Sequence, residues 1–130
     1  MAPVYAAEPE VVRVLVIDPD PNAQATYSRA LNGAGYDLVF AHEGIDGVCK
    51  VWDHKPGIVF AAIDLPRLDG FKVCEIIRRH PQFQQVAVLL VAPSAGLFEK
   101  SHAMLAGASD YLAKPLSEEQ VAGALLQYTS

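Results

Sequence analysis

The chain has 130 residues, of which 52% are hydrophobic and 19% are charged; this composition is typical of one folded domain and excludes an intrinsically disordered protein. A formal net charge of -5, with Lys and Arg residues scattered along the chain, argues against direct binding to nucleic acid. No apolar stretch approaches the ~20 residues of a membrane-spanning helix, so no membrane contact is expected. We expect residues 1–10 to form a flexible lead-in and residues 11–128 to form the domain.

The first predicted strand is residues 11–17, VVRVLVI, whose nearly continuous β-branched residues are typical of a strand that is covered on both faces. A helix is predicted to follow. Asp20 can cap its N-terminus, and Pro21 suits its first turn. Apolar residues continue at helical spacing until the helix ends at Gly33 or Gly35.

The middle of the chain continues the alternation of strands and helices. A short strand is predicted at residues 36–41, and a helix follows at residues 43–54. Four residues at helical spacing are predicted to form the inner face of that helix: Ile45, Val48, Cys49 and Trp52. Residues 58–63 are predicted to be the central strand. The helix predicted at residues 70–80 is expected to be buried through Val73, Ile76 and Ile77.

The remaining elements are predicted at residues 86–91 (strand), 94–106 (helix), 108–112 (strand) and 117–127 (helix). Ser94 is predicted to cap the first of these helices, and Ser117 with Gln120 forms a capping box at the start of the second. Five strands that alternate with five helices predict a single-domain (βα)5 α/β fold. Its parallel sheet would have right-handed crossovers and helices on both faces, as in a doubly wound sandwich.

The cysteine and histidine residues do not predict a metal site. Cys49 and Cys74 fall at apolar helical positions without metal-ligand spacing, and none of the four histidines has a second ligand three or four residues away. Buried free thiols are the expected state of both cysteines, which favours a cytoplasmic protein.

In such a sheet the working site is expected at the carboxyl ends of the strands. The chemistry-bearing residues at these positions are Asp18, Asp20, Asp64, Asp69, Ser94 and Lys114. No glycine-rich phosphate loop follows any predicted strand, so nucleotide binding is not expected. The sequence also lacks a Ser-His-Asp or Cys-His arrangement.

Three segments carry a resemblance to a known family: VLVIDPDP after the first strand, PRLDG after the third, and GASDYLAKPL near the end. In this order they resemble the receiver domain of bacterial response regulators, a flavodoxin-like (CheY-like) phosphoacceptor module, over residues 11–128. The resemblance implies an acidic pair that holds Mg²⁺ after strand one and a phosphoacceptor Asp at the end of strand three. It also implies a hydroxyl residue at the end of strand four, the Lys of a Lys-Pro pair, and a mobile aromatic residue on strand five.

The position that corresponds to the phosphoacceptor is Ala62. Spacings counted from Pro56 and from Pro66 agree on this position, and a methyl group cannot accept a phosphoryl group. Asp64 lies two residues later, which is two steps of ~3.3 Å along an extended strand. In-line attack tolerates much less displacement, so Asp64 is expected to be a loop acid.

Two further positions depart from the family pattern. Asp18 matches the first acid, but the second is Pro19, and Asp20 is expected to serve as the helix cap. The hydroxyl position is Ala92. With so few side-chain oxygens left, Mg²⁺ is not expected to bind, and no other metal or cofactor is expected.

Two features of the family are retained. Lys114-Pro115 is intact, and the resemblance implies a cis peptide bond there. Without a phosphoacceptor, Lys114 is expected to neutralise Asp18. The aromatic position is occupied by Tyr111.

The three departures predict a pseudo-receiver, a non-enzymatic module of a bacterial, cytoplasmic signalling protein that acts through protein contacts without phosphorylation. It would contact a protein partner, an output domain that follows it in a longer regulator, or a second copy. By resemblance the contact face is helix four, strand five and helix five, which carry Phe98, His102, Leu105, Tyr111, Leu116, Glu118 and Gln120. Two alternatives stay open: an active receiver that uses Asp64 or another acid with Mg²⁺, and a receiver-like sensor of a small anionic molecule through Asp18 and Lys114.

Overall fold

The computed structural model of the chain describes residues 11–93 and 96–129. The predicted lead-in at residues 1–10 and the predicted cap Ser94 lie outside these residues. The strands are β1 Arg13–Ile17, β2 Asp37–Ala41, β3 Ile58–Ala62, β4 Ala87–Ala92 and β5 Asp110–Ala113. The helices are α1 Pro21–Leu31, α2 Gly44–His54, α3 Gly70–Arg79, α4 Leu97–Leu105 and α5 Glu118–Thr129, with a short 3-10 helix η1 at Pro81–Phe83.

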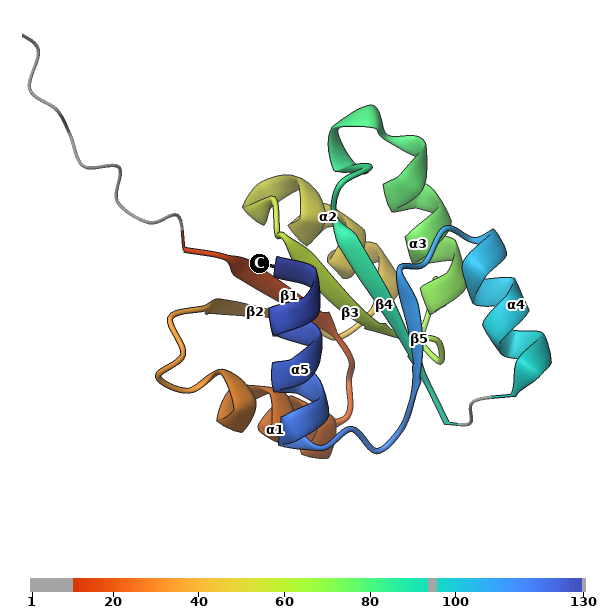
Figure 1. The fold of residues 1–130 in the computed structure, drawn as a ribbon. Helices are drawn as coiled ribbons and strands as arrows, with labels where there is room; N and C mark the ends of the chain where they lie inside the picture. Colours follow the sequence, from red (N-terminus) through yellow and green to blue (C-terminus); the bar gives the residue numbers. More distant parts are fainter. Residues whose placement is uncertain (1–10, 94–95, 130) are drawn as a thin grey trace, which may run out of the picture.

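All strand pairs are parallel, in the order β2-β1-β3-β4-β5. Helices α1 and α5 cover one face of the sheet, and α2, α3 and α4 cover the other (Figure 1). The predicted doubly wound, flavodoxin-like fold is therefore confirmed, with element boundaries displaced by a few residues. No helix in the described part of the chain is long and apolar enough to span a membrane.

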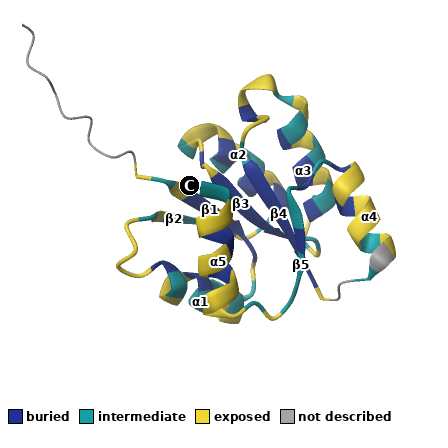
Figure 2. Cartoon of the chain, viewed as in Figure 1, coloured by how far each residue is buried: buried dark blue, intermediate teal, exposed yellow. Residues whose placement is uncertain are grey.

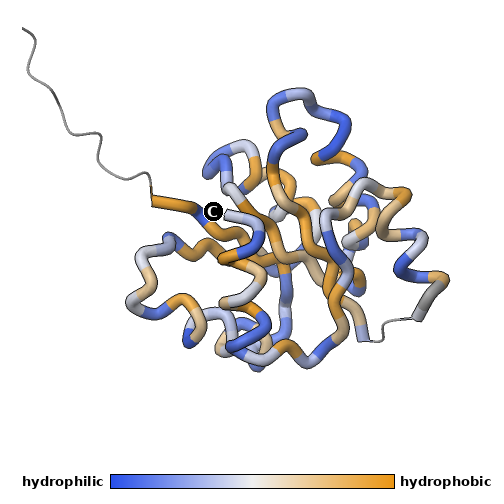
Figure 3. The backbone as a smooth tube through the Cα atoms, in the orientation of Figure 1, coloured by the Kyte–Doolittle hydropathy of each residue, from blue (hydrophilic) through white to orange (hydrophobic). Residues whose placement is uncertain are grey.

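The core lies on both faces of the three central strands, where the backbone tube is mostly hydrophobic (Figures 2 and 3). Every residue of β3 and β4 is buried, as the continuous apolar runs predicted. One cluster joins the sheet to α2, α3 and α4, and includes Leu15, Val59 and Ile77. The other joins it to α1 and α5, and includes Tyr27 and Phe60, whose rings lie 5.1 Å apart.

Side-chain caps fix the starts of α1 and α5 as the sequence predicts. The Asp20 carboxylate accepts a hydrogen bond from the Asn22 N–H at 2.9 Å, and Pro21 occupies the first turn of α1. At α5, the Ser117 N–H donates to Gln120 and the Gln120 N–H donates to Ser117, which is the predicted capping box.

The predicted inner face of α2 is wrong for three residues, which are exposed: Ile45, Cys49 and Trp52. Val48 is half-buried and packs on the core, and the buried residues of the helix are Gly44, Gly47 and Val51. A Cβ on Gly47 would lie 2.4 Å from Ile17 Cδ1, and one on Gly44 would lie 2.0 Å from the Leu68 carbonyl oxygen. A side chain larger than hydrogen therefore cannot stand at Gly47, which packs on β1, or at Gly44, which packs on the loop before α3, while Val51 fills the space further along the helix.

Helix α3 also departs from its predicted burial at one position. Val73 and Ile77 are buried as expected, but Ile76 is 37% exposed. Cys74 takes the inward position instead, because it lies next to Val73 and one turn before Ile77 and Arg78 on the core side of the helix.

The C-terminal turn of α3 is tied to three other segments by Arg78. Its guanidinium donates to the carbonyl oxygens of Val86 at 2.6 Å, Gly107 at 2.7 Å and Phe83 at 3.2 Å. It also donates to the Ser109 hydroxyl at 3.1 Å, and that hydroxyl accepts a bond from the Val88 N–H at the start of β4.

The two thiols are predicted to differ in reactivity. Cys49 is exposed, whereas Cys74 is fully buried and donates to the Ala106 carbonyl oxygen at 3.4 Å. Burial, reinforced by Glu75 and opposed by Arg78, raises the pKa of Cys74 to about 11. Ellman's reagent at pH 8 should therefore modify one thiol in the folded chain and both after unfolding in guanidinium. A folded Cys49→Ser variant that still reacts rapidly would contradict the burial of Cys74.

Candidate functional site

The parallel register brings the sequence-predicted site residues to one edge of the sheet. Ile17 pairs with Ala61, Ala62 pairs with Val91, and Ala92 pairs with Ala113. Asp18 follows β1 and Lys114 follows β5, so both lie at the same carboxyl edge as Ala62 and Ala92.

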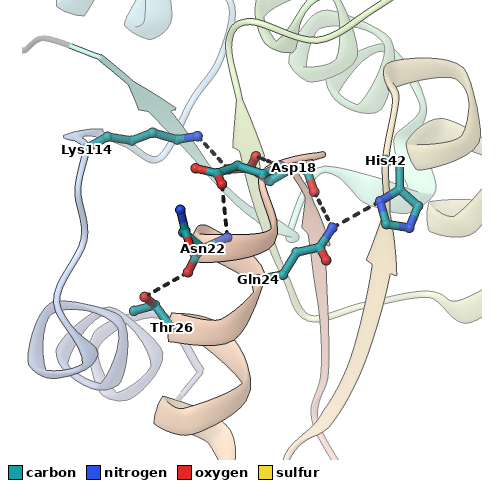
Figure 4. Close-up of polar contacts among 7 residues, drawn as sticks. Asp18, Asn22, Gln24, Thr26, His42 and Lys114 are labelled. Atoms are coloured by element: carbon teal, nitrogen blue, oxygen red, sulfur yellow. Dashed lines mark hydrogen bonds and ion pairs between the residues drawn. The ribbon is translucent and has the colours of Figure 1, made fainter.

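Asp18 and Lys114 form a close ion pair at this edge. The Lys114 Nζ lies 2.7 Å from Asp18 Oδ2 (Figure 4). The Asp20 N–H donates to Asp18 Oδ1 at 2.9 Å. The Asp18 side chain is 3% exposed and that of Lys114 is 27% exposed. Both carboxylate oxygens therefore have a partner from the chain itself, and Lys114 lies where the sequence places it. The Lys114-Pro115 peptide bond is cis, as the resemblance implied.

The backbone of Asp18 is held by the neighbouring elements. Its N–H donates to the Ala41 carbonyl oxygen at 2.9 Å, and the Gln24 side-chain amide donates to its carbonyl oxygen at 2.8 Å. The same amide lies 3.0 Å from His42 Nδ1, which links α1 to the end of β2 (Figure 4). Sequence reasoning missed Gln24 and His42, since their only signal was their position near the ends of two strands.

Ala62 is the last residue of β3 and is 4% exposed. Its methyl group lies at the strand tip, and the next residue continues the sheet contact because the Ile63 N–H donates to the Val91 carbonyl oxygen at 3.0 Å. Asp64 is exposed beyond this point. Asp69 caps α3 by accepting a bond from the Lys72 N–H at 2.9 Å.

The described residues offer few side-chain oxygens to a cation at this edge. Mg²⁺ prefers several carboxylate, carbonyl or water oxygens in octahedral geometry. Pro19 and Ala62 supply no side-chain oxygen, and the Asp18 carboxylate is already bonded to Lys114 and to Asp20 N–H. No group of three His, Cys, Asp or Glu residues with metal-binding geometry lies within residues 11–93 and 96–129. The residues present therefore do not match the ligand set of this metal.

Tyr111 is buried, with 6% of its surface exposed. Burial raises its pKa, and the carboxylates of Glu99 and Asp64 raise it further. Tyr111 is predicted to belong to the candidate contact face; in this structure its ring packs in the core cluster on the α4 side of the sheet, so little of it is exposed to a partner.

The other residues of the predicted contact face differ in exposure. Phe98 is 83% exposed and Leu105 is 89% exposed, so α4 presents apolar side chains to solvent. His102 is exposed and stacks on Phe71 with ring centroids 3.9 Å apart. Leu116 is half-buried against the α1–α5 cluster, which removes most of it from the predicted face.

Helix α5 contributes two polar residues of the predicted face. Glu118 is exposed and pairs with Arg29 of α1 at 3.3 Å, and Gln120 is exposed and serves in the capping box. The face that remains open to a partner is therefore centred on Phe98 and Leu105 of α4.

A pocket of about 370 Å³ opens beside the ion pair, between α1 and the loop that joins β5 to α5. Asn22, Thr26, Tyr27 and Lys114 contribute polar groups to its lining. Burial, and to a lesser extent the charge of Asp18, raises the pKa of Tyr27, so its phenol stays protonated. Sequence reasoning missed this pocket, because its walls come from α1, the end of β4 and the β5–α5 loop, which lie far apart along the chain.

Comparison with known proteins agrees with this geometry. The family model described as the response regulator receiver domain matches residues 14–126. Protein PilG of Pseudomonas aeruginosa is 34% identical over 114 residues, which are 88% of this chain and 84% of that protein. The DNA-binding dual master transcriptional regulator RpaA of Synechocystis is 34% identical over 109 residues, which are 84% of this chain and 45% of that protein. The chain thus spans less than half of RpaA.

Solved structures show the same fold. A response regulator from Chloroflexus aurantiacus has a TM-score of 0.84 at 25% identity, covering 92% of this chain and 98% of that one. Chemotaxis response regulator CheY4 of Vibrio cholerae has a TM-score of 0.85 at 21% identity, covering 92% and 99%. The arrangement of the strand ends, the matching family model and the relatives together establish that the chain belongs to the response regulator receiver domain family.

Proposed function

We propose that this receiver domain is a pseudo-receiver, which takes part in two-component signalling through protein contacts and without phosphorylation of its own. The observation that carries the proposal is Ala62 at the tip of β3, where a carboxylate would have to stand to attack a phosphoryl group. Pro19 and Ala92 support it, because neither supplies an oxygen to a metal or to a phosphoryl group. In this proposal the domain is not an enzyme, works in the bacterial cytoplasm, and needs no Mg²⁺.

The proposal gives the Asp18–Lys114 pair a structural role. Lys114 Nζ lies 2.7 Å from a carboxylate that is almost fully buried, so each charge neutralises the other. A lysine held in this way keeps the β5–α5 loop against the start of α1. In this proposal the β5–α5 loop keeps one conformation, because no phosphoryl group on this domain competes for Lys114.

The proposed contact surface is the exposed side of α4, with Phe98 and Leu105 as its apolar anchors. These residues lie seven positions apart, which places them on one side of the helix two turns from each other. The partner is proposed to be another signalling protein or an output domain in a longer regulator. If a second copy binds this face instead, substitution of Leu105 would weaken self-association. The matched region covers 45% of RpaA, so more than half of that relative lies outside the receiver domain. This length supports an output domain as one candidate partner.

An active receiver is the second candidate, and the similarity to response regulators such as PilG favours it. The acceptor would be Asp64, which is exposed two residues beyond Ala62 at the end of β3. A sensor of a small anionic molecule is the third, and the pocket of about 370 Å³ beside Lys114 favours it.

Incubation with acetyl phosphate and Mg²⁺, followed by intact-mass measurement, tests the proposal. We expect no phosphoryl adduct on the chain, and no change in the NMR signals of Asp18 and Tyr111 when beryllofluoride and Mg²⁺ are added. An adduct that disappears in the Asp64→Asn variant would establish the active receiver instead. A thermal shift with inorganic phosphate that is lost in Lys114→Met, without any covalent adduct, would favour the sensor.

A further inference from the structure

A second surface of the protein, away from the strand tips and from α4, has the features of an interface. A groove of about 290 Å³ runs between α2 and α3, on the sheet face opposite α1 and α5 (Figure 1). Val51, Ile77 and Phe83 line it and belong to the core, so the groove opens directly onto the hydrophobic interior.

Large apolar side chains stand exposed along this groove and beside it. Trp52 is 46% exposed, Ile45 is 48% exposed and Ile76 is 37% exposed. The Trp52 ring makes edge contacts with His80 at 4.4 Å and Phe83 at 5.0 Å between ring centroids, which fixes it at one end of the groove. Clustered exposed apolar residues around a groove are typical of a protein contact site, whereas isolated ones are common everywhere.

Charged residues of opposite sign border the two sides of this apolar band. On the outer side of α2 lie Asp46 and Asp53, seven residues apart, and on the outer side of α3 lie Lys72 and Arg79, also seven residues apart. Asp46 is paired with Lys50 at 2.9 Å within its own helix, and Lys72 is paired with Glu75 at 3.2 Å. Among the described residues Asp53 and Arg79 have no ion-pair partner and are exposed, so both are available to another molecule.

Asp53 and Arg79 lie at the same level along the groove. Both helices follow parallel strands and run from the carboxyl edge of the sheet to its other edge (Figure 1). Gly44 of α2 packs against Leu68 near the start of α3, and Trp52 packs against His80 at the end of α3. Asp53 and Arg79 are each the tenth residue of their helices. The acidic and basic sides of the groove are therefore in register.

We propose that this face binds a second copy of the same chain, in a two-fold dimer whose axis runs parallel to the groove. Rotation about such an axis exchanges the α2 side and the α3 side of the groove. It leaves the position of each residue along the length of the groove unchanged. It places α2 of one copy over α3 of the other, with Asp53 of each copy opposite Arg79 of its partner. The exposed Trp52, Ile45 and Ile76 side chains of both copies are then covered by the partner copy, and two identical ion pairs flank the end of the groove near Trp52.

Charge complementarity identifies a second copy as the occupant. A groove that is acidic on one side and basic on the other is complementary to itself after this two-fold rotation. A uniformly acidic or uniformly basic partner would meet a like charge on one of the two sides, which costs affinity.

Sedimentation equilibrium of the full chain over a range of concentrations tests the dimer. We expect a reversible dimer whose dissociation constant rises about tenfold or more in Arg79→Glu and in Asp53→Arg, since each variant places like charges opposite each other in both ion pairs. The double variant Asp53→Arg/Arg79→Glu exchanges the charges, and it is expected to restore most of the lost affinity. The matched control Leu126→Ser removes an apolar residue of α5 that is 68% exposed and should leave the dimer unchanged.

Reactivity of Cys49 gives an independent measurement. Cys49 is exposed on the outer side of α2, so dimer formation should slow its reaction with Ellman's reagent as protein concentration rises, and Arg79→Glu should abolish this dependence. A chain that stays monomeric at about 1 mM overturns the proposal, because a dimer with a dissociation constant below that concentration would be populated there. So does a double variant that dimerises no better than the single variants. A dimer that is lost only in Leu105→Ser would place the contact on α4 instead.

Discussion

Replacing Gly70 with alanine is expected to lower the free energy of unfolding by about 3 kcal/mol, the upper part of the range for overpacked sites. A Cβ at this position would lie 2.4 Å from the Ala62 carbonyl oxygen and 2.9 Å from the Ile63 Cα. Both are backbone atoms, so neither can turn aside as a side chain would. The Gly70 N–H also donates to the Ile63 carbonyl oxygen at 3.0 Å, and that bond would lengthen as α3 moves away.

Gly123→Ala is the matched control for this substitution. Gly123 lies within α5, is exposed, and has no heavy atom within 4 Å of the position of an added Cβ. Alanine there should stabilise the domain by about 0.5–1 kcal/mol, because it favours the helix without a clash. Urea unfolding followed by circular dichroism measures both changes. Equal and small effects for the two variants would show that β3 and α3 are not in the close contact described here.

Lys114→Met is expected to lower the free energy of unfolding by about 3 kcal/mol, the lower end of the range for breaking a buried ion pair. The Asp18 carboxylate, 3% exposed, would keep only the bond from the Asp20 N–H at 2.9 Å. The Lys114 side chain is 27% exposed, so water can replace part of its contribution, which keeps the effect at the lower end. Chemical denaturation at neutral pH measures the difference.

The double variant Asp18→Asn/Lys114→Met tests whether Lys114 stabilises the fold through its ion pair with Asp18. Asparagine keeps an acceptor for the Asp20 N–H and removes the buried charge, so most of the stability lost in Lys114→Met should return. If the two substitutions instead destabilise the domain additively, the ion pair is not what Lys114 contributes.

The fold followed from the sequence because its signals were local and repeated. Continuous apolar runs such as residues 86–91 predict two-sided strands, and Asp20, Asp69 and Ser117 mark helix starts. These interactions span only a few residues, so the chain order reveals them. Parallel pairing then follows from the alternation of the two kinds of element.

The orientation of α2 did not follow from the sequence, because hydrophobic periodicity gives glycine no inward preference. Gly47 lies against β1 and Gly44 against the loop before α3, and neither contact leaves room for a Cβ. That constraint comes from residues far away along the chain, Ile17 and Leu68. Ile45, Cys49 and Trp52 therefore have the helical spacing of a buried face, but their side chains are exposed in the structure.

Those parts of the site that depend on residue spacing along the chain were predictable from the sequence. Those that depend on how distant elements pack were not. Spacing from two prolines assigned position 62, and the structure places Ala62 at the end of β3. The Lys114 contact with Asp18 followed from the order of the strand ends. By contrast, the depth of Tyr111 and the pocket beside Tyr27 depend on how α4 and the β5–α5 loop pack, which no local pattern encodes.

The Arg78 network has a consequence for binding at the α2–α3 groove. The guanidinium holds the Phe83 and Val86 carbonyl oxygens, so the chain segment under one end of the groove is fixed to α3 before any partner arrives. Phe83 in turn supports the Trp52 ring at 5.0 Å. A surface whose shape is already set loses little conformational entropy when it is covered. Even a modest apolar contact at this groove can therefore yield measurable affinity, because little of it is spent on ordering the surface.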